Sequence, residues 1–417
     1  MPLPSGLHAL SSREFRIYIS GNIVAQIGSW MQTVAQSWLV LQLTDSAFLL
    51  GLTATLQSGP ILLLSVFTGV LADRLTKRNV LIFTQAVQGA LALALGLLAW
   101  SGHVRYWHIA LMAVTWGVMN ALDQPTRLSF IMELVGRPQL VSAVGMNSAS
   151  FNTARIVGPS VAGVLIGRVG VFSGFVLNAL AFLISITVLT RLPARRPSPR
   201  TGATTVLGEV AEGIAYAART PVVRFVLGLQ VIVSFCVFNF SVYVPLLARH
   251  VLGLGSEGFG FLMTSLGVGA ILAGLSLGAI GARQPPPGMI AAALAVACAG
   301  LLALAVTRDF WLAALLLATI GLTGTIVSGS CNTSLQLMAP DALRGRVMSL
   351  YTVLSSGVFP VGAFFVGALS QSWGVSTAFA VNGALGLAAV AGLVWLHGPR
   401  TRRLAEASSS SPPGRAV

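Results

Sequence analysis

Charged residues are scarce in this sequence, and acidic residues are the scarcest of them. Only 9% of the 417 residues are charged, with 11 Asp and Glu against 25 Lys and Arg, while 55% are hydrophobic. A water-soluble domain needs roughly a quarter of its residues charged to cover its surface. The composition therefore excludes an ordinary soluble protein and predicts a chain that is embedded largely in a lipid bilayer.

Cysteine and histidine are also sparse. The three cysteines stand singly in apolar stretches with no CxxC pair, and the five histidines are scattered, so neither a disulfide framework nor a metal site is expected. The chain also lacks a Walker-type phosphate loop, an HExxH motif and a nucleophile elbow. We therefore expect no enzyme activity, no ATP-driven pumping and no cofactor.

Apolar runs long enough to cross a bilayer as helices occupy nearly the whole chain. The sequence predicts an all-α integral membrane protein of about twelve transmembrane helices, at 15–43, 47–72, 79–101, 106–130, 140–167, 171–191, 222–248, 257–281, 288–306, 310–337, 347–371 and 374–397. The first run is too long for a signal peptide.

Basic residues lie mostly in alternate connections between these spans. Only Arg105, Arg168, Arg249 and Arg308 fall on the other side. The positive-inside rule then predicts that both termini and the central connection face the cytoplasm. Although a net charge of +14 suggests nucleic acid in a soluble protein, here it is explained by topology, and no nucleic-acid partner is expected.

An internal repeat divides the chain. The runs that begin at Gly170 and Gly374 match at one constant offset, on which Gly163 and Gly367 also fall. We expect two six-helix halves in pseudo-two-fold parallel repeat, at 1–190 and 222–397. A cytoplasmic linker at 191–221 should contain a short amphipathic helix, and the tail at 398–417 should be disordered.

The connection between the second and third spans carries a motif. Its sequence, Gly69-Val70-Leu71-Ala72-Asp73-Arg74-Leu75-Thr76-Lys77-Arg78, resembles the major facilitator signature G-x-L-x-D-R-x-G-R-[KR], with Thr76 and Lys77 as departures. The resemblance implies that this segment forms a cytoplasmic latch between the halves, through Gly69, Asp73, Arg74, Lys77 and Arg78, with Asp123 at the inner end of span four. The alternative is a basic connection that only sets topology.

Two further runs resemble one exporter branch of that superfamily, which contains enterobactin and macrolide efflux proteins. They are Asp123-Gln124-Pro125-Thr126-Arg127 and the stretch from Asn152 through Gly158-Pro159 to Gly163. The resemblance implies a monomer in the bacterial inner membrane, surrounded by lipid, that exports a siderophore, macrolide or other amphiphilic small molecule by alternating access. Gly158, Pro159 and Gly163 resemble the span-five motif of antiporters, although ordinary small-residue helix packing explains them equally well.

Polar and aromatic residues recur at helical spacing within several spans, where they should face a central substrate cavity or one another. The predicted lining is Asn22, Gln26, Trp30, Thr33, Gln57, Trp116, Asn120, Asn152, Arg155, Gln230, Ser234, Phe238, Asn332 and Gln336. Arg155 is the only clear charge within a span, which makes it a candidate for function. It could bind an anionic or carbonyl-rich solute, pair with a carboxylate such as Asp123, or bond to backbone carbonyls.

Ion coupling has weaker support in the sequence, because no acidic residue lies clearly in the middle of a span. Proton antiport is the expected mechanism, with Asp123 and Asp45 as candidate carriers. Asp45 precedes Ser46 at the outer start of span two, where it is also expected to cap the helix. The alternatives are an uncoupled or uptake facilitator and a non-transporting membrane receptor or scaffold on the same fold.

Overall fold

The computed structural model describes residues 5–195, 214–280, 285–340 and 343–409. Within these ranges the side chains of 5–7, 65–67, 69–74, 137, 279–280 and 397–409 are not described. All regular structure in the described ranges is helical, and nine of their helical segments are long and apolar enough to cross a bilayer. The predicted all-helical architecture is therefore confirmed for the described residues, with nine candidate membrane spans.

The first group of helices follows a short 3-10 turn, η1 (Ser5–Ser11). It comprises α1 (Arg13–Thr44), α2 (Ala47–Arg74), α3 (Lys77–Trp100), α4 (Tyr106–Arg168) and α5 (Phe172–Thr190). Helix α4 is interrupted at Gly136, where φ is 70° and ψ is 175°. Glycine adopts this backbone conformation without the clash that a Cβ would cause. The break divides α4 into two segments that match the spans predicted at 106–130 and 140–167.

The second group comprises α7 (Pro221–Ile232), η2 (Val233–Val237), α8 (Phe240–Leu246), η3 (Leu247–Val251), α9 (Ser256–Ile280), α10 (Pro287–Val306), α11 (Phe310–Met338), α12 (Arg344–Trp373) and α13 (Val375–Ser409). The span predicted at 222–248 is thus interrupted by two π-helical stretches. Apart from the C-terminal end of α13, helix ends elsewhere lie within a few residues of the predicted ends.

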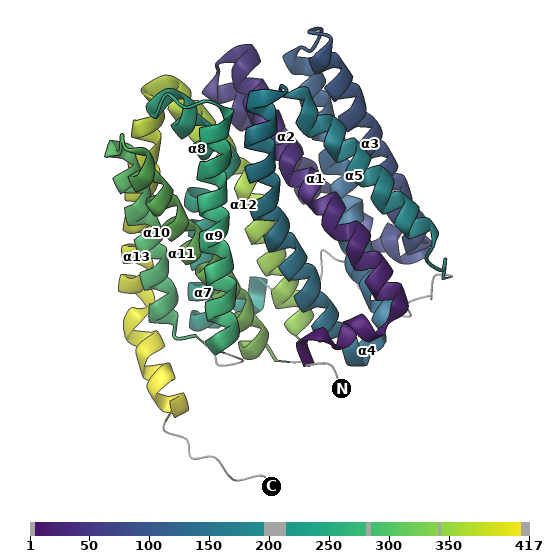
Figure 1. Cartoon of the computed structure of the whole chain (residues 1–417). Coiled ribbons are helices and arrows are strands. Elements are labelled where there is room, and N and C mark those ends of the chain that lie inside the picture. Colours follow the sequence, from purple (N-terminus) through teal and green to yellow (C-terminus); the bar gives the residue numbers. More distant parts are fainter. Residues whose placement is uncertain (1–4, 196–213, 281–284, 341–342, 410–417) are drawn as a thin grey trace.

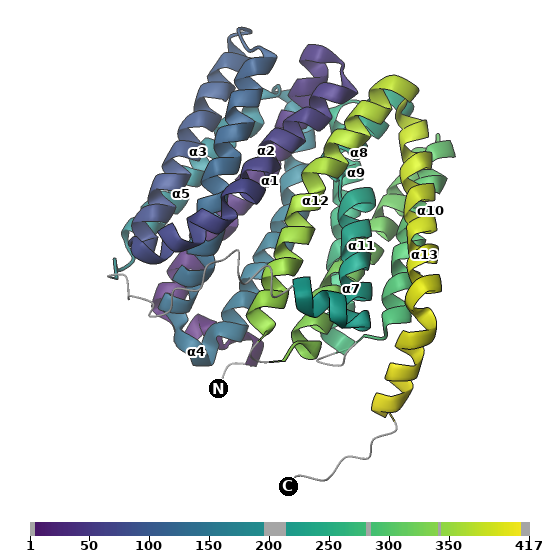
Figure 2. The ribbon, with the colours of Figure 1, turned by 180° about the vertical axis from the view of Figure 1, so that it is seen from behind.

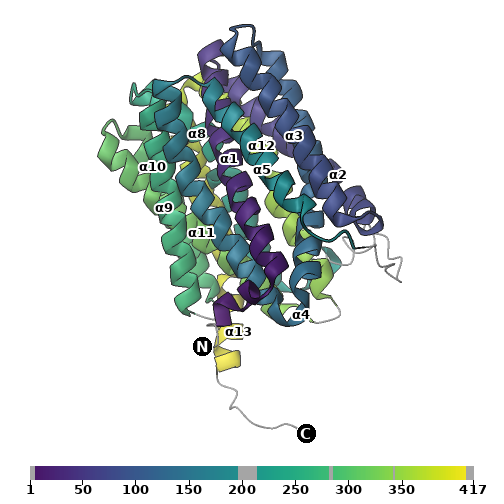
Figure 3. The same cartoon turned by 45° about the vertical axis from the view of Figure 1, so that its right-hand side comes forward.

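The two groups stand side by side, and both ends of the chain lie at the same end of the bundle (Figures 1 and 2). We call this the terminal end, and the opposite one the distal end. Helix α4 packs against both α1 and α9, and α2 packs against both α4 and α12, so α2 and α4 connect the groups. The turned view in Figure 3 shows α4 between α1 and α9.

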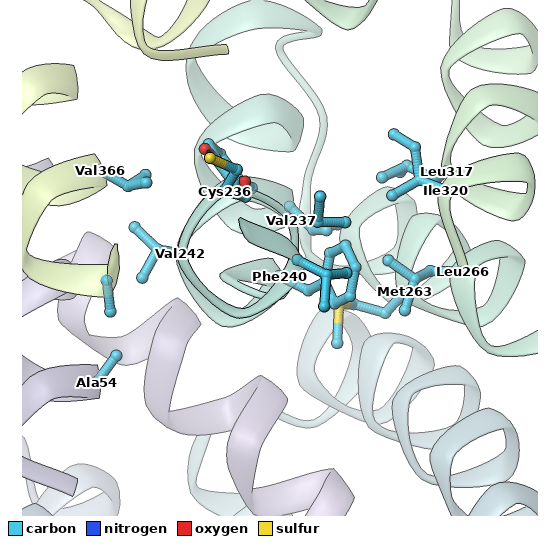
Figure 4. Packing of buried hydrophobic residues seen from close by; sticks show 14 of the residues in the cluster. Ala54, Cys236, Val237, Phe240, Val242, Met263, Leu266, Leu317, Ile320 and Val366 are labelled. Carbon is cyan, nitrogen blue, oxygen red and sulfur yellow. Dashed lines mark hydrogen bonds between the residues drawn. The ribbon is translucent and has the colours of Figure 1, made fainter. Parts of the chain in front are cut away.

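The interrupted helix lies in the middle of the hydrophobic core (Figure 4). Cys236 and Phe240 pack there with Met263 of α9, Ile320 of α11 and Ala54 of α2. All three cysteines are buried and unpaired. They pack in the core as small side chains, and the Cys331 thiol also donates to the Val226 carbonyl at 3.5 Å.

Two predicted segments fall partly outside the described residues. Residues 196–213 of the linker, in which a short amphipathic helix is expected, lie outside the described residues, and the described chain is helical from Ile214 to Arg219. At the other end, α13 continues to Ser409, beyond residue 398 where we expected the disordered tail to begin. Leu404, Ala405 and Glu406 favour helix, which accounts for the extension.

Candidate functional site

Two glycine contacts bring the helix groups together near the distal end. A Cβ added to Gly163 of α4 would lie 2.8 Å from the Cα of Gly260 in α9, and one added to Gly51 of α2 would lie 2.8 Å from the Cα of Gly367 in α12. Helix backbones can approach this closely only where both residues lack side chains. We call these four glycines the distal seal. Its members Gly163 and Gly367 are the two that match in the sequence repeat.

Hydrogen bonds accompany each glycine contact. The hydroxyls of Ser160 and Thr264 lie 2.6 Å apart between α4 and α9, and the Thr55 hydroxyl donates to the Pro360 carbonyl at 2.9 Å between α2 and α12. The Ser37 hydroxyl also donates to the Ser241 carbonyl at 3.2 Å. Ser160, Thr264 and Thr55 also donate to carbonyls of their own helices, so the bonds between the groups add to contacts that each helix already makes.

An ionic cluster lies beyond the seal, at the distal surface. Asp45 accepts from Nε of Arg249 at 2.8 Å and lies 3.2 Å from Nε2 of His250. Burial acts to raise the pKa of Asp45, but the hydrogen bond from His250 and the positive charge of Arg249 outweigh it and lower that pKa below its ordinary value. The cluster therefore contains an ionised carboxylate that joins the two groups.

The structure corrects the expected capping role of Asp45. The N-cap of α2 is Ser46, whose hydroxyl accepts from the Leu49 amide at 3.2 Å. Asp45 instead ends α1 in the left-handed conformation, with φ of 48°, and this turns its carboxylate toward the second group. The Ser46 hydroxyl also donates to Gln371 Oε1 at 2.9 Å. A cavity of about 380 Å³ adjoins the cluster, with Asp45, His250, Arg308 and Gln371 in its wall.

A second buried polar network lies toward the terminal end, within the first group. Asp123 is 3% exposed, and its carboxylate accepts from the Thr84 hydroxyl and from Nε of Arg127, both at 2.9 Å. Arg127 also donates to Asn22 Oδ1, and Asn22 donates to Asn147 at 3.0 Å. The network thus links α1, α3 and both segments of α4. Because Asp123 pairs with Arg127, the suggested Asp123–Arg155 pair is wrong.

The described part of the predicted latch forms contacts within the first group only. Lys77 pairs with Glu133 of α4, and Arg78 donates to the Leu192 carbonyl at 2.8 Å. The side chains of Gly69, Asp73 and Arg74 lie outside the described residues. In this conformation, Lys77 and Arg78 do not connect the two groups.

Arg155 lies among aromatic rings from both groups. Its guanidinium carbon is 5.8 Å from the Trp30 ring centroid in α1 and 5.9 Å from that of Phe240 in α8. Trp30 in turn meets Phe151 edge to face at 5.7 Å. Nε of Arg155 is buried without a hydrogen-bond partner, while the side chain as a whole is partly exposed. Within the described residues this cation has aromatic neighbours but no carboxylate.

The other predicted cavity residues form separate local contacts. Thr33 and Asn152 donate to carbonyls of their own helices. The amides form pairs: Gln230 donates to Ser234, Gln336 donates to Asn332, and Gln57 accepts from Gln36. Phe238 meets Phe240 edge to face, and Trp116 and Asn120 are partly buried. Gln26 is partly exposed, and its Oε1 is buried without a partner. None of them lines the distal cavity.

Gln32 and Gln36 on α1 were not among the site residues predicted from the sequence. Gln32 is buried and accepts from Asn178 of α5, and Gln36 donates to Gln57 at 3.4 Å. The available signal was Asn178 itself, because an amide in an apolar span needs a buried partner.

The span-five motif has two different neighbours. A Cβ on Gly158 would lie 2.5 Å from Cβ of Trp30, so this glycine lets α4 approach α1 within the first group. Gly163 lies five residues further along α4 and contacts α9 of the second group instead. Pro159 lies between them inside α4, and its carbonyl oxygen would lie 2.8 Å from a Cβ on Gly260.

Comparisons with solved structures agree with the helix arrangement. The nucleoside transporter NupG superposes with a TM-score of 0.73 at 11% identity, over 92% of this chain and 98% of that one. A bacterial homologue of the human lysosomal transporter Spinster gives a TM-score of 0.69 at 15% identity, over 99% and 100% of the two chains. This chain therefore shares its fold with both of these structures.

Sequence comparison places the chain more narrowly. It belongs to the major facilitator family described as transmembrane secretion effectors, whose model matches residues 4–417. The protein is thus a membrane transporter and not an enzyme.

Curated relatives of this chain are efflux and siderophore transporters. The multidrug efflux pump Tap of Mycolicibacterium fortuitum is 25% identical over 93% of this chain and 96% of its own. The staphyloferrin A transporter of Staphylococcus aureus is 23% identical over 88% and 92%. The enterobactin exporter EntS of Escherichia coli is 25% identical over 85% of each chain.

Proposed function

We propose that this protein is a secondary active exporter of amphiphilic small molecules that works by alternating access. The observation that carries the proposal is the position of the contacts between the helix groups. The glycine contacts, their flanking hydrogen bonds and the Asp45 cluster all lie toward the distal end. Lys77 and Arg78, near the terminal end, bond within their own group.

The proposed topology has twelve spans in two halves, at 1–190 and 222–397. Nine apolar helices supply nine spans, and α1 and the two segments of α4 supply three more. Because the basic connections lie at the terminal end, the positive-inside rule assigns that end to the cytoplasm. The distal end is then the outer side, and the conformation described here is closed to the outside.

In the proposed cycle the distal seal and the cytoplasmic latch alternate. Opening the outer side would break the contacts of Gly163 and Gly51 and separate Asp45 from Arg249. Closing the inner side would bring Asp73 and Arg74 against the second half, as the signature motif implies. Charge-assisted bonds suit this role because they are strong when aligned and are replaced by water when parted.

We place proton coupling at Asp123. Its carboxylate is buried and accepts from Arg127, which in turn donates to Asn22. A proton taken up by the carboxylate would remove the negative charge that holds Arg127, and would so release Arg127 and Asn22. Since Asn22 is bonded to Asn147 in the second segment of α4, release would loosen the packing of α1 on that segment. Asp45 is the alternative carrier on the outer side.

The substrate class is proposed from the relatives together with the aromatic surroundings of Arg155. The relatives are named for multidrug efflux, enterobactin export and staphyloferrin A transport. Aromatic rings beside isolated amide groups suit a bulky solute with a few polar groups. We expect the protein to act as a monomer in the bacterial inner membrane.

Flux in proteoliposomes tests this function. The proteoliposomes would be loaded in turn with drugs that multidrug efflux pumps export and with catecholate and carboxylate siderophores. Counterflow of each solute would be measured with and without an imposed pH gradient. Saturable flux that the gradient drives supports proton-coupled export. Saturable flux that ignores the gradient would favour an uncoupled facilitator, and absence of flux for the whole panel would favour a receptor or scaffold.

A further inference from the structure

We propose that Arg155 is the specificity-determining residue of the substrate site and selects amphiphilic anions, in which a carboxylate or an acidic phenol is joined to an aromatic or apolar body. This inference rests on the proposed transport function and adds the charge of the substrate to it. It depends on the neighbours of Arg155 and on its position along α4.

The charge of Arg155 has no acidic partner in the described structure. The described acidic residues are engaged elsewhere: Asp123 with Arg127, Glu133 with Lys77, Glu14 with Arg195, Asp45 with Arg249, and Asp309 with the Leu312 amide. Glu257 lies in the first turn of α9, beside Gly167 at the distal end of α4. A cation within a membrane is costly unless a charge of opposite sign or a set of hydrogen bonds compensates it.

The aromatic neighbours compensate Arg155 only in part. The guanidinium lies within 6 Å of the Trp30 and Phe240 centroids, close enough for cation–π attraction. Such rings offer no oxygen acceptor to the guanidinium, whose Nε is buried without a hydrogen-bond partner. Phe151 beside Trp30 and Phe238 beside Phe240 extend the aromatic surface on both sides. A solute that stacks on these rings and carries an anionic oxygen would supply the missing acceptors.

The position of Arg155 suits a substrate site in an alternating-access cycle. It precedes Gly163 of the distal seal by about two helical turns, or about 12 Å along α4. It therefore lies on the terminal side of the seal, the side that we propose is open. Trp30 belongs to the first helix group and Phe240 to the second, so a ligand bound to Arg155 would contact both halves.

Gln26 provides a second unpartnered group nearby on α1, one turn before Trp30. Its Oε1 is buried and accepts no hydrogen bond within the described chain. It could accept from a hydroxyl or amide of the solute. An uncompensated cation and an unsatisfied amide oxygen, both close to Trp30, define a site for a ligand with an acidic group and a neighbouring donor.

The test uses two dyes that share a xanthene ring and differ in charge, anionic 5-carboxyfluorescein and cationic rhodamine 123. Binding to the purified protein in lipid nanodiscs would be followed by fluorescence polarisation for wild type, Arg155→Gln, Arg155→Lys and Arg168→Gln. Arg168→Gln is the matched control, because it removes an exposed arginine from the same helix.

We expect the wild type to prefer carboxyfluorescein, and Arg155→Gln to weaken that binding about 10- to 100-fold while leaving rhodamine 123 unchanged or tighter. Arg155→Lys should fall between, because lysine keeps the charge but loses the bidentate geometry. Arg168→Gln should match the wild type.

Equal loss of both dyes in Arg155→Gln would show a positioning role and overturn the proposal, as would wild-type binding that ignores charge or an absence of binding to either dye. Flux of the same dyes in proteoliposomes distinguishes a failure of the anion site from a failure of the transport function. Binding of the anion that depends on Arg155, with no flux in the wild type, would leave the anion site standing and remove the transport function.

Discussion

Replacing Gly163 by alanine should shift the protein toward a conformation that is open at the distal end. The added Cβ would lie 2.8 Å from the Cα of Gly260 and 2.9 Å from the Ser256 carbonyl oxygen. Both are backbone atoms, so no flexible side chain can move aside. Ordinary contact needs several tenths of an ångström more, and this can be gained only if α4 and α9 separate.

The size of the effect follows from the cost of overpacking. An extra methyl group in a close-packed contact costs about 1–3 kcal/mol. If that cost falls on the outward-closed state alone, the ratio of open to closed molecules rises about 5- to 150-fold. A conformation populated at about one per cent would then become readily measurable.

The distance between spin labels at Leu43 and Trp373 would report the change. Both residues are exposed, and they end α1 and α12 in different groups. The native cysteines would be removed first, and the distance distribution measured in nanodiscs. We expect a longer-distance population to grow in Gly163→Ala and further in Gly163→Val.

Gly145→Ala is the matched control, because it lies on the same helix and a Cβ there would meet no atom within 4 Å. Gly367→Ala should act like Gly163→Ala, since its Cβ would lie 2.8 Å from Cα of Gly51 and from the Ala47 carbonyl oxygen. A distribution for Gly163→Ala identical to that of Gly145→Ala would refute the assignment of a seal.

Three further perturbations test other parts of the account. Since pairing lowers the pKa of Asp45, its contribution to distal closure should be present above the ordinary aspartate pKa of about 3.9 and be lost as the pH falls through the lowered value. The distance between the same two labels should therefore lengthen below about pH 4 in the wild type. Asp45→Asn should show the longer distance already at neutral pH. A wild-type distance in Asp45→Asn would show that the ionic cluster does not contribute to distal closure. Asp123→Asn should lower stability in detergent by about 1–3 kcal/mol because Arg127 loses its charged partner, and adding Arg127→Gln should recover part of it; equal stability of the single variant and the wild type would contradict the network. Asp73→Asn should impair flux while leaving membrane insertion and thermal stability intact, and full activity in that variant would exclude the latch.

The positions of the helices were predicted from the sequence more accurately than the contacts between their side chains. Apolar runs fix where helices lie because lipid leaves backbone groups no other partner, and even the division of α4 agrees with its predicted spans. The π-helical stretches around Phe238 could not be predicted, because tertiary packing determines them. Pairing with Asp123 was one of three roles suggested for Arg155, but in the structure Asp123 pairs with Arg127, one turn away on the same helix.

The polar faces show a similar limit. Helical spacing grouped Asn22 with Trp30 on α1, yet the structure places Asn22 in the Asp123 network and Trp30 against Arg155. Spacing determines which residues share a face but not which neighbouring helix each one meets. The Gly163 contact shows the converse, because the repeat marked the residue but could not reveal that it meets Gly260.

The central claim is that export is coupled to protons through an alternating-access cycle. Its most direct test uses inverted membrane vesicles, acidified inside by respiration and loaded with a pH-sensitive dye, to which a transported solute is added. The account predicts that the solute releases protons from the vesicles in the wild type and not in Asp123→Asn. Saturable solute flux without proton release in the wild type would contradict it.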